Sequence, residues 1–244
     1  MIAIDDPDYA PDYDSLPPGV DPKSLPFGSP ASYHVFEYGR KIGEERRAHP
    51  QDDLVSRLVH ADVDGDSLTE LEYCNMFQIL ILAGNETTRT TLTHGMKAFI
   101  DTPDQWELLR ERPELIDSAV EEIIRWATPV LYMRRTALED TELRGQQIKA
   151  GDKVVMWYMS ANYDEDVFDD PHAFDIARDP NPHLGFGGGG PHFCLGAWLA
   201  RLQIRVMFEE CLARDLRLAS DGPVRRVRSN FVNGVKSMPV RVAG

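Results

Sequence analysis

The stretch that decides the fold is Phe186-Gly187-Gly188-Gly189-Gly190-Pro191-His192-Phe193-Cys194-Leu195-Gly196. Consecutive glycines allow a backbone to turn sharply and to lie flat against a large ligand. A helical pattern follows, with apolar residues on one side at Leu199, Leu202, Val206 and Leu212. The sequence therefore places Cys194 where a tight loop enters a helix, and the free N–H groups at that end of a helix favour a thiolate. The plain alternative is a glycine-rich turn beside a buried structural cysteine.

Composition narrows the class of protein. The chain has 244 residues, 42% of them hydrophobic, which suits one or two globular domains. It carries 40 acidic and 26 basic residues, a net charge of −14, so a nucleic-acid partner is not expected. The other two cysteines, Cys74 and Cys211, lie in apolar helical patterns and are predicted to be core residues. A sparse, odd set of cysteines indicates no disulfide framework and favours a cytoplasmic location.

Neither a signal peptide nor a transmembrane segment is expected. Acidic residues follow Met1 almost at once, at Asp5, Asp6 and Asp8. The longest apolar run, 76–84, is interrupted by Gln78 and is too short to span a bilayer.

Hydrophobic periodicity predicts a mainly α fold with small β-sheets. Residues 1–30, rich in Pro, Asp and Gly, are expected to be irregular, and 60–66 to form a polar turn. Helices are predicted over 32–49, 52–59, 69–100, 103–110, 113–126 and after the cysteine up to 213. Strands are predicted at 130–136, 141–144, 147–148 and 153–157, with a last small sheet from 216–218, 231–232 and 240–242.

The longest predicted helix contains an unusual centre. Thr69 and Glu72 indicate a capping box at its start. Further along, the apolar pattern is interrupted by Ala83-Gly84-Asn85-Glu86-Thr87-Thr88. Glycine and threonines in mid-helix cost stability. The small pair indicates either close packing of another helix or a gap for a ligand beside an acid and an alcohol, and the helix alone does not decide between them.

Taken together and in order, these features resemble cytochrome P450. They are the small-small-x-acid-Thr-Thr helix, the pair Glu122 and Arg125 in a Glu-x-x-Arg helix, an arginine at Arg135 before short strands, and the glycine-rich cysteine loop. The resemblance runs from about residue 67 to the C-terminus. It implies the P450 fold, mainly α with small β-sheets and lacking its N-terminal part. Residues 1–244 would form a single, partial P450 domain, with the oxygen-binding helix at 67–101, the Glu-x-x-Arg helix at 113–126 and the haem-ligand loop and helix at 186–213.

Within that family, the sequence is most similar to bacterial methyl-branched lipid omega-hydroxylases and steroid C26/C27 monooxygenases. The similarity lies in the words Ala83–Arg89, Tyr132–Thr136 and 181–186 for the former group, and in 135–137 and 160–165 for the latter. The cysteine loop also has one residue more between Phe186 and Cys194 than most P450s, as in these lipid-oxidising groups.

The resemblance implies a role for each motif residue. Cys194 would be the axial thiolate of haem b (iron protoporphyrin IX), a ligand that favours O–O cleavage. Glu86 and Thr87 would serve proton delivery to bound O2. Glu122 and Arg125 would be structural. Further haem contacts are implied for Ala83, Gly84, Arg135, Phe186, Gly187, His192 and Gly196, with Arg135 and His192 at the propionates.

The resemblance also implies a reaction and partners. The activity would be monooxygenation of a hydrophobic lipid or sterol-like substrate, with electrons from NAD(P)H through a ferredoxin reductase and a ferredoxin. Ordinary core packing explains the candidate pocket residues equally well. These candidates are Ile79, Leu82, Val130, Leu131 and Phe231. A basic surface with Arg201 and Arg205 would be the candidate docking face for an acidic ferredoxin.

One departure from the family pattern is large. The long N-terminal half of P450s has no counterpart here, and truncation is the expected explanation. A truncated or degenerate haem-binding fragment without turnover is therefore the alternative function. A zinc site built from Cys194, His192 and His183 is a third hypothesis, although the spacing lacks the paired ligands of structural zinc sites.

Overall fold

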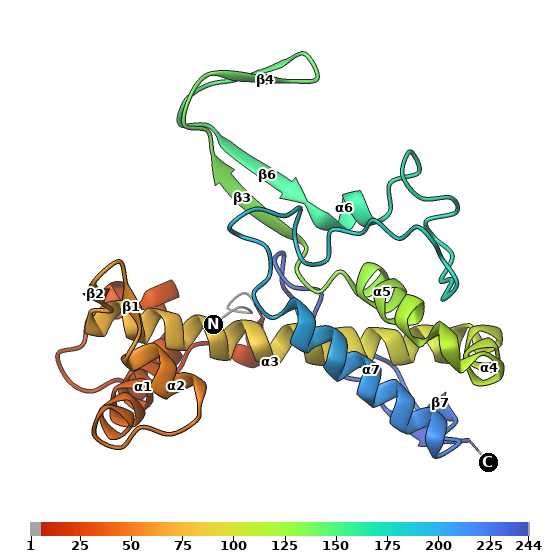
Figure 1. The fold of residues 1–244 in the computed structure, drawn as a ribbon, viewed down its shortest axis with the longest axis horizontal. Helices are drawn as coiled ribbons and strands as arrows, with labels where there is room; N and C mark the ends of the chain where they lie inside the picture. Colours follow the sequence, from red (N-terminus) through yellow and green to blue (C-terminus); the bar gives the residue numbers. More distant parts are fainter. Residues whose placement is uncertain (1–5, 244) are drawn as a thin grey trace. The chain divides into compact units, whose positions relative to one another are not determined.

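The computed structural model describes residues 6–243 (Figure 1). The chain divides into two compact units, one ending at Glu86 and the other beginning at Thr87. The boundary falls within one continuous helix, α3 (Glu70–Asp101). Each unit is described separately.

The first unit is a small helical cluster. It contains α1 (Pro30–Ala48), α2 (Leu54–Val59) and the first half of α3, preceded by the short 3₁₀ turns Pro7–Tyr9, Tyr13–Ser15, Pro22–Ser24 and Pro26–Gly28. Its core is formed by Phe36, Tyr73, Cys74 and Phe77, so the predicted burial of Cys74 is confirmed. Gly39 on α1 allows close approach of α3, because a Cβ there would lie 2.8 Å from the Phe77 ring.

Two local predictions in this unit have different outcomes. The capping box is present, since the Thr69 N–H donates to Glu72 Oε2 at 2.8 Å and the Glu72 N–H donates to Thr69 Oγ1 at 3.3 Å. The predicted polar turn is instead a small hairpin of β1 (Asp62–Val63) and β2 (Asp66–Ser67). Its two turn residues, Asp64 and Gly65, both have positive φ, the geometry that joins antiparallel strands.

The second unit contains the larger core. Its helices are the second half of α3, α4 (Pro103–Glu111), the 3₁₀ turn Pro113–Leu115, α5 (Ile116–Ala127), α6 (Tyr158–Asn162) and α7 (Ala197–Ala213). The helix α6 was not predicted. Helix α5 packs against α7 (Figure 1). Buried side chains of α3, α4, α5 and α7 meet in one cluster that includes Phe99, Leu109, Ile123, Ile204 and Phe208.

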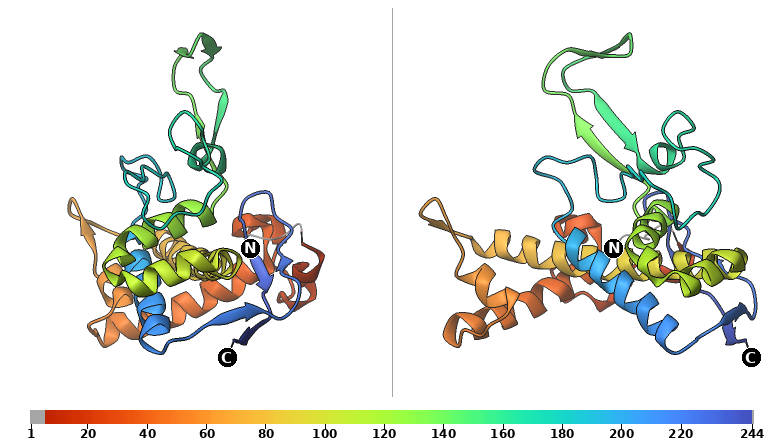
Figure 2. Two further views of the ribbon diagram at one scale, coloured as in Figure 1. Left: turned by 90° about the vertical axis from the view of Figure 1, so that its right-hand side faces the viewer. Right: turned by 45° about the vertical axis from the view of Figure 1, so that its right-hand side comes forward.

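The strands form small antiparallel pairs. Strand β3 (Tyr132–Thr136) pairs with β6 (Lys153–Trp157), and β4 (Thr141–Leu143) pairs with β5 (Gln146–Ile148). Near the C-terminus, β7 (Leu218–Ser220) pairs with β10 (Val240–Val242), and β8 (Arg225–Arg226) with β9 (Val235–Ser237). Figure 2 shows the β3–β6 ribbon extending away from the helices of its own unit.

Helix α7 differs from its prediction in the face that it buries. Ala197, Ile204, Phe208 and Cys211 are buried, which confirms the core position of Cys211. Leu199, Leu202 and Val206, which defined the apolar side in the sequence, are 59%, 55% and 46% exposed. Periodicity identified the helix correctly, but the side that packs against α5 is set by the position of the helix in the fold.

Among residues 6–243, no helix combines the length and apolar character that crossing a membrane would need.

Candidate functional site

Cys194 lies at the end of the glycine-rich loop, less than one turn before α7. Its N–H donates to the Phe186 carbonyl at 3.1 Å, and its own carbonyl accepts the Ala197 N–H at 3.2 Å. The loop is thereby closed between Phe186 and Cys194, while the Cys194 side chain is exposed. The structure thus presents an exposed thiol just before the first turn of α7.

The glycines give the loop its shape. Gly187, Gly189 and Gly190 have φ values of 88°, 94° and 73°, a region that residues with a Cβ rarely adopt. A Cβ built on Gly188, Gly189 or Gly190 would meet no described atom within 4 Å. The loop is therefore open at these three positions, whereas a Cβ on Gly196 would lie 4.0 Å from the Cys194 sulfur.

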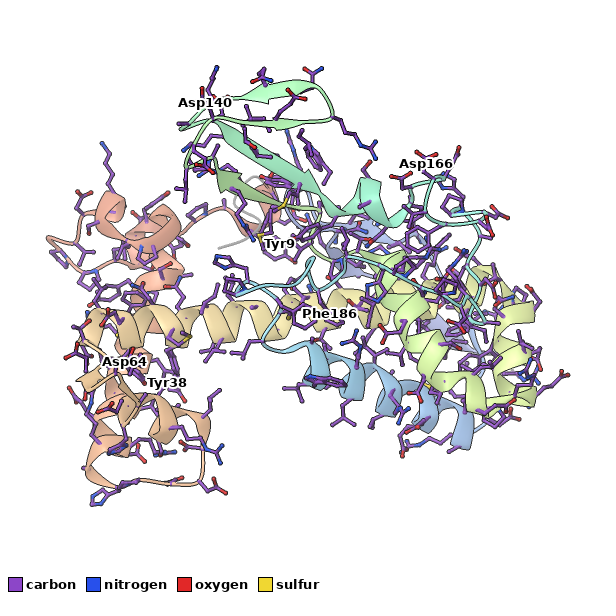
Figure 3. All side chains as sticks on the ribbon, turned by 45° about the horizontal axis from the view of Figure 1, so that its top comes forward. Tyr9, Tyr38, Asp64, Asp140, Asp166 and Phe186 are labelled. Atoms are coloured by element: carbon purple, nitrogen blue, oxygen red, sulfur yellow. The ribbon has the colours of Figure 1, made fainter. Side chains whose placement is uncertain are left out.

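The apolar side chains that neighbour Cys194 in the sequence are exposed, and the described residues do not cover them. Phe193 and Leu195, its sequence neighbours, are 43% and 84% exposed, and Trp198 on the first turn of α7 is 81% exposed. An exposed apolar surface beside an exposed thiol is suited to a large, flat, apolar ligand. Phe186, labelled in Figure 3, lies in the same loop and is half-buried.

A charged cluster links this loop to α5 and α7. Glu121 accepts two hydrogen bonds from Arg201, at 2.6 Å from Nε and 2.8 Å from Nη2, and one from His183 Nε2 at 2.9 Å. The Arg201 guanidinium lies 4.5 Å from the centre of the Phe186 ring. Burial opposes ionisation of Glu121, but the hydrogen bonds from Arg201 and His183 outweigh it and lower the pKa of Glu121 to about 2. Sequence reasoning did not identify Glu121.

The Glu-x-x-Arg pair is completely buried. Glu122 and Arg125 are joined by two hydrogen bonds of 2.8 Å, and both side chains have no exposed surface. Arg125 also donates to the carbonyls of Asn162, Pro171 and Ala173. The pair therefore ties α5 to the end of α6 and to residues 163–182, the irregular segment that leads to the cysteine loop. This is a far larger role than that of a surface ion pair.

Two members of this network were missed in the sequence. Arg178 donates to Glu122 Oε2 at 3.2 Å and, through its other nitrogens, to backbone carbonyls of the irregular segment. Asn162 donates to Thr128 Oγ1 and accepts the Leu184 N–H at 2.7 Å, just before the glycine loop. Arg178 lies in an irregular segment, where no periodicity marks a residue. For Asn162, the only available signal was the similarity of 160–165 to known sequences.

The candidate oxygen-binding residues lie on α3. Ala83, Gly84 and Glu86 belong to the first unit and Thr87 begins the second. A Cβ on Gly84 would meet no atom of residues 6–86 within 4 Å, so a helix of that unit does not explain the small pair. Ile79 is 46% exposed and Leu82 is half-buried. The roles assigned to these residues stay predictions.

The other candidates lie in the second unit. Leu131 donates its N–H to the Phe231 carbonyl at 2.9 Å, and Val130 forms a β-bridge with Val232, so the structure brings Val130, Leu131 and Phe231 together. Arg135 and His192 are exposed, Arg135 on β3 and His192 in the loop. A propionate role for either stays a prediction.

Observed contacts argue against two further hypotheses, the zinc site and the docking surface for a ferredoxin. In the zinc hypothesis, His183 would bind metal, but one of its ring nitrogens bonds Glu121 and the other accepts the Gly185 N–H at 3.1 Å. Among residues 6–243, no three His, Cys, Asp or Glu side chains are grouped to hold a metal ion. In the docking hypothesis, Arg201 and Arg205 would be free cations, but they pair with Glu121 and Asp117 of α5.

Comparison with known proteins identifies the family. The family model described as Cytochrome P450 matches residues 105–227, and this chain belongs to that family. The steroid C26-monooxygenase of Mycolicibacterium smegmatis is 47% identical over 245 residues, which cover 100% of this chain and 53% of that protein. The methyl-branched lipid omega-hydroxylase of Mycobacterium tuberculosis is 47% identical over 247 residues, covering 98% and 54%.

The fold agrees with this assignment. The solved structure of a cytochrome P450 of Mycobacterium marinum, in complex with pseudoionone, matches with a TM-score of 0.81 and 49% identity. The match covers 85% of this chain and 50% of that one. The chain thus has a P450 fold and spans about half the length of the relatives it matches.

The loop fits the haem cofactor that the family implies. An exposed thiol, an open glycine face and an uncovered apolar surface lie together around Cys194. Cysteine thiolate is a known protein ligand of haem iron. Cys194 would therefore hold the iron, and Phe186, Gly187 and Gly196 would line the cysteine side of the ring.

Proposed function

We propose that the protein to which this chain belongs is a haem-thiolate monooxygenase that hydroxylates a hydrophobic lipid or sterol-like substrate. The observation that carries the proposal is the exposed Cys194 thiol on a positive-φ glycine loop at the start of α7. Haem b, when bound, supplies O2 binding and activation. The names of the relatives, a steroid C26-monooxygenase and a methyl-branched lipid omega-hydroxylase, support the substrate class.

The chain's own residues would divide the remaining tasks. The Cys194 sulfur would be held as thiolate by the N–H groups at the start of α7. Ala83 and Gly84 would leave room beside α3, and Glu86 and Thr87 would hold and pass protons from solvent. Val130, Leu131 and Phe231 would present an apolar surface to the substrate, and Ile79 and Leu82 are the substrate-contact candidates on the first half of α3. Arg135 and His192 would pair with carboxylates at the ring edge.

Electrons would come from NAD(P)H through a ferredoxin reductase and a ferredoxin, in the cytoplasm. Because Arg201 and Arg205 are paired within the protein, the ferredoxin would need other cations.

The ligand assignment is tested by spectroscopy of the 244-residue chain after incubation with haem. We expect the reduced, CO-bound chain to show the absorbance band of thiolate-ligated haem, and Cys194→Ser to lose it. Cys211→Ser, a buried position on the helix α7 that follows Cys194, is the matched control and should keep the band. A band that survives in Cys194→Ser would disprove the ligand assignment. Failure of the wild-type chain to take up haem would favour the fragment without turnover.

A further inference from the structure

Helix α5 carries two adjacent carboxylates with different partners. Glu122 faces the irregular segment through Arg125 and Arg178. Glu121, one residue earlier and therefore turned by about 100° on the helix, faces the cysteine loop and α7 through His183 and Arg201. The family's Glu-x-x-Arg pattern accounts for Glu122 and leaves Glu121 without an assigned role.

The contacts of Glu121 reach both ends of the loop. Arg201 belongs to α7, so its two hydrogen bonds to Glu121 fix the helix that follows Cys194. His183 precedes the loop, and its Nδ1 accepts the Gly185 N–H at 3.1 Å. Because a backbone N–H can only donate, Nδ1 carries no proton, and Nε2 is the nitrogen that donates to Glu121. One carboxylate thus fixes the orientation and tautomer of His183 and, through it, the backbone that enters the loop.

The same cluster also contacts Phe186, the first residue of the loop. The Arg201 guanidinium, 27% exposed, lies over the ring of Phe186 at 4.5 Å. Phe186 in turn accepts the Cys194 N–H at its carbonyl. A cation over an aromatic ring is a favourable contact, and the fork of arginine allows it together with two bonds to a carboxylate. Gly185 adds a steric constraint, because a Cβ there would lie 2.5 Å from Ile124 of α5.

We propose that Glu121, His183 and Arg201 form a positioning cluster that fixes the Cys194 loop against α5. Its components are positioning residues, since none of them is bonded to the Cys194 sulfur. The role of the loop in haem ligation rests on the proposed function, whereas the placement of the loop by the cluster does not. The cluster would hold the loop in the same conformation before and after the cofactor binds.

The test is hydrogen exchange of the full 244-residue chain without haem, read by mass spectrometry over peptides that span 183–196. The informative amides are those of Gly185, Gly187 and Cys194, which are hydrogen-bonded within the loop. We expect Glu121→Gln and Arg201→Gln to raise their exchange by about tenfold or more, because charge-assisted bonds are lost. Arg201→Lys should give a partial effect, since a lysine keeps the charge but cannot form the fork.

The matched control is Arg205→Gln. Arg205 lies one turn further along α7 and pairs with Asp117 of α5, so it makes the same kind of bridge away from the loop. We expect unchanged exchange over 183–196 in this variant. Peptides from the α3 segment 92–100 monitor global opening, and they should exchange at the wild-type rate in all variants.

Unchanged loop exchange in Glu121→Gln and Arg201→Gln, or an increase no larger than in Arg205→Gln, would overturn the proposal. A uniform increase that includes 92–100 would also overturn it, because the cluster would then stabilise the whole unit and not the loop. A second measurement separates this inference from the proposed function. If Cys194→Ser keeps the thiolate band, the ligand assignment fails, while the exchange result still decides the role of the cluster.

Discussion

Replacement of Arg125 by methionine tests the buried network most directly. All five N–H donors of the guanidinium are used: two bonds go to Glu122, and one each to the carbonyls of Asn162, Pro171 and Ala173. Methionine fills most of the volume but donates nothing. Breaking a buried pair by removing one partner costs about 3–5 kcal/mol, because the remaining charge is uncompensated.

Part of that cost is offset by the other donors to Glu122. Arg178 Nε lies 3.2 Å from Oε2, Asn181 Nδ2 lies 3.0 Å from Oε2, and the Asp175 N–H lies 3.0 Å from Oε1. We therefore expect a loss of about 4 kcal/mol in the free energy of unfolding, near the middle of the range. That loss corresponds to a change of roughly a thousandfold in the folding equilibrium.

The measurement is urea unfolding of the full chain followed by circular dichroism. Arg125→Lys should lose about 2 kcal/mol, since an ammonium keeps the charge but not the fork. Combining Arg125→Met with Glu122→Gln should cost at least about 1 kcal/mol less than the sum of the two single changes, because the bonds between the two side chains are lost only once and Glu122 no longer leaves an uncompensated carboxylate. As a control, Arg214→Ala breaks an exposed pair with Glu210 and should change stability by less than about 0.5 kcal/mol. A loss below about 1 kcal/mol in Arg125→Met would refute the reasoning.

Three further predictions concern residues of α3. Burial lowers the pKa of His94, whose Nε2 lies 2.9 Å from the Asn233 carbonyl, so the folded state favours the neutral ring. The stability from this site should be present above pH 6.5, the ordinary pKa of histidine, and should be lost as the pH falls below it. In urea midpoints measured between about pH 7.5 and 5.5, His94→Asn should therefore depend less steeply on pH than the wild-type chain. An unchanged pH dependence in His94→Asn would contradict the prediction. Gly95→Ala would place a Cβ 2.6 Å from Ile123 and should destabilise the chain by about 1–3 kcal/mol in urea unfolding. Gly84→Ala, which meets no atom of residues 6–86, should instead stabilise the helix by about 0.5–1 kcal/mol; equal effects at the two glycines would contradict the packing explanation.

The features that the sequence predicted correctly depend on residues that are close together in the chain. The Thr69–Glu72 capping box and the helices on either side of Pro103 and Pro113 depend on residues a few positions apart, and the structure contains them as predicted. The loop 186–196 was equally local, because only glycines accommodate its positive φ angles. The family assignment followed from the order of such local motifs.

The features that the sequence did not predict depend on contacts between residues that are far apart in the chain. The hydrophobic period of the sequence predicted an apolar side of α7. Which side is buried depends on the packing of α7 against α5, which lies 70 or more residues earlier in the chain. Glu121 and Glu122 are adjacent and have the same side chain. Only the fold decides that Glu121 contacts the elements around the cysteine loop and that Glu122 contacts the irregular segment. Asn162 ends the short helix α6, Arg178 lies in an irregular segment, and neither stretch showed a period in the sequence. Their importance comes from backbone carbonyls and N–H groups that the fold brings to them. The sequence by itself thus determined the cysteine loop and its chemistry, because glycine torsions and a thiol beside a helix start are local properties. The tertiary structure alone decided what holds that loop in place, because burial and pairing arise only when distant segments meet.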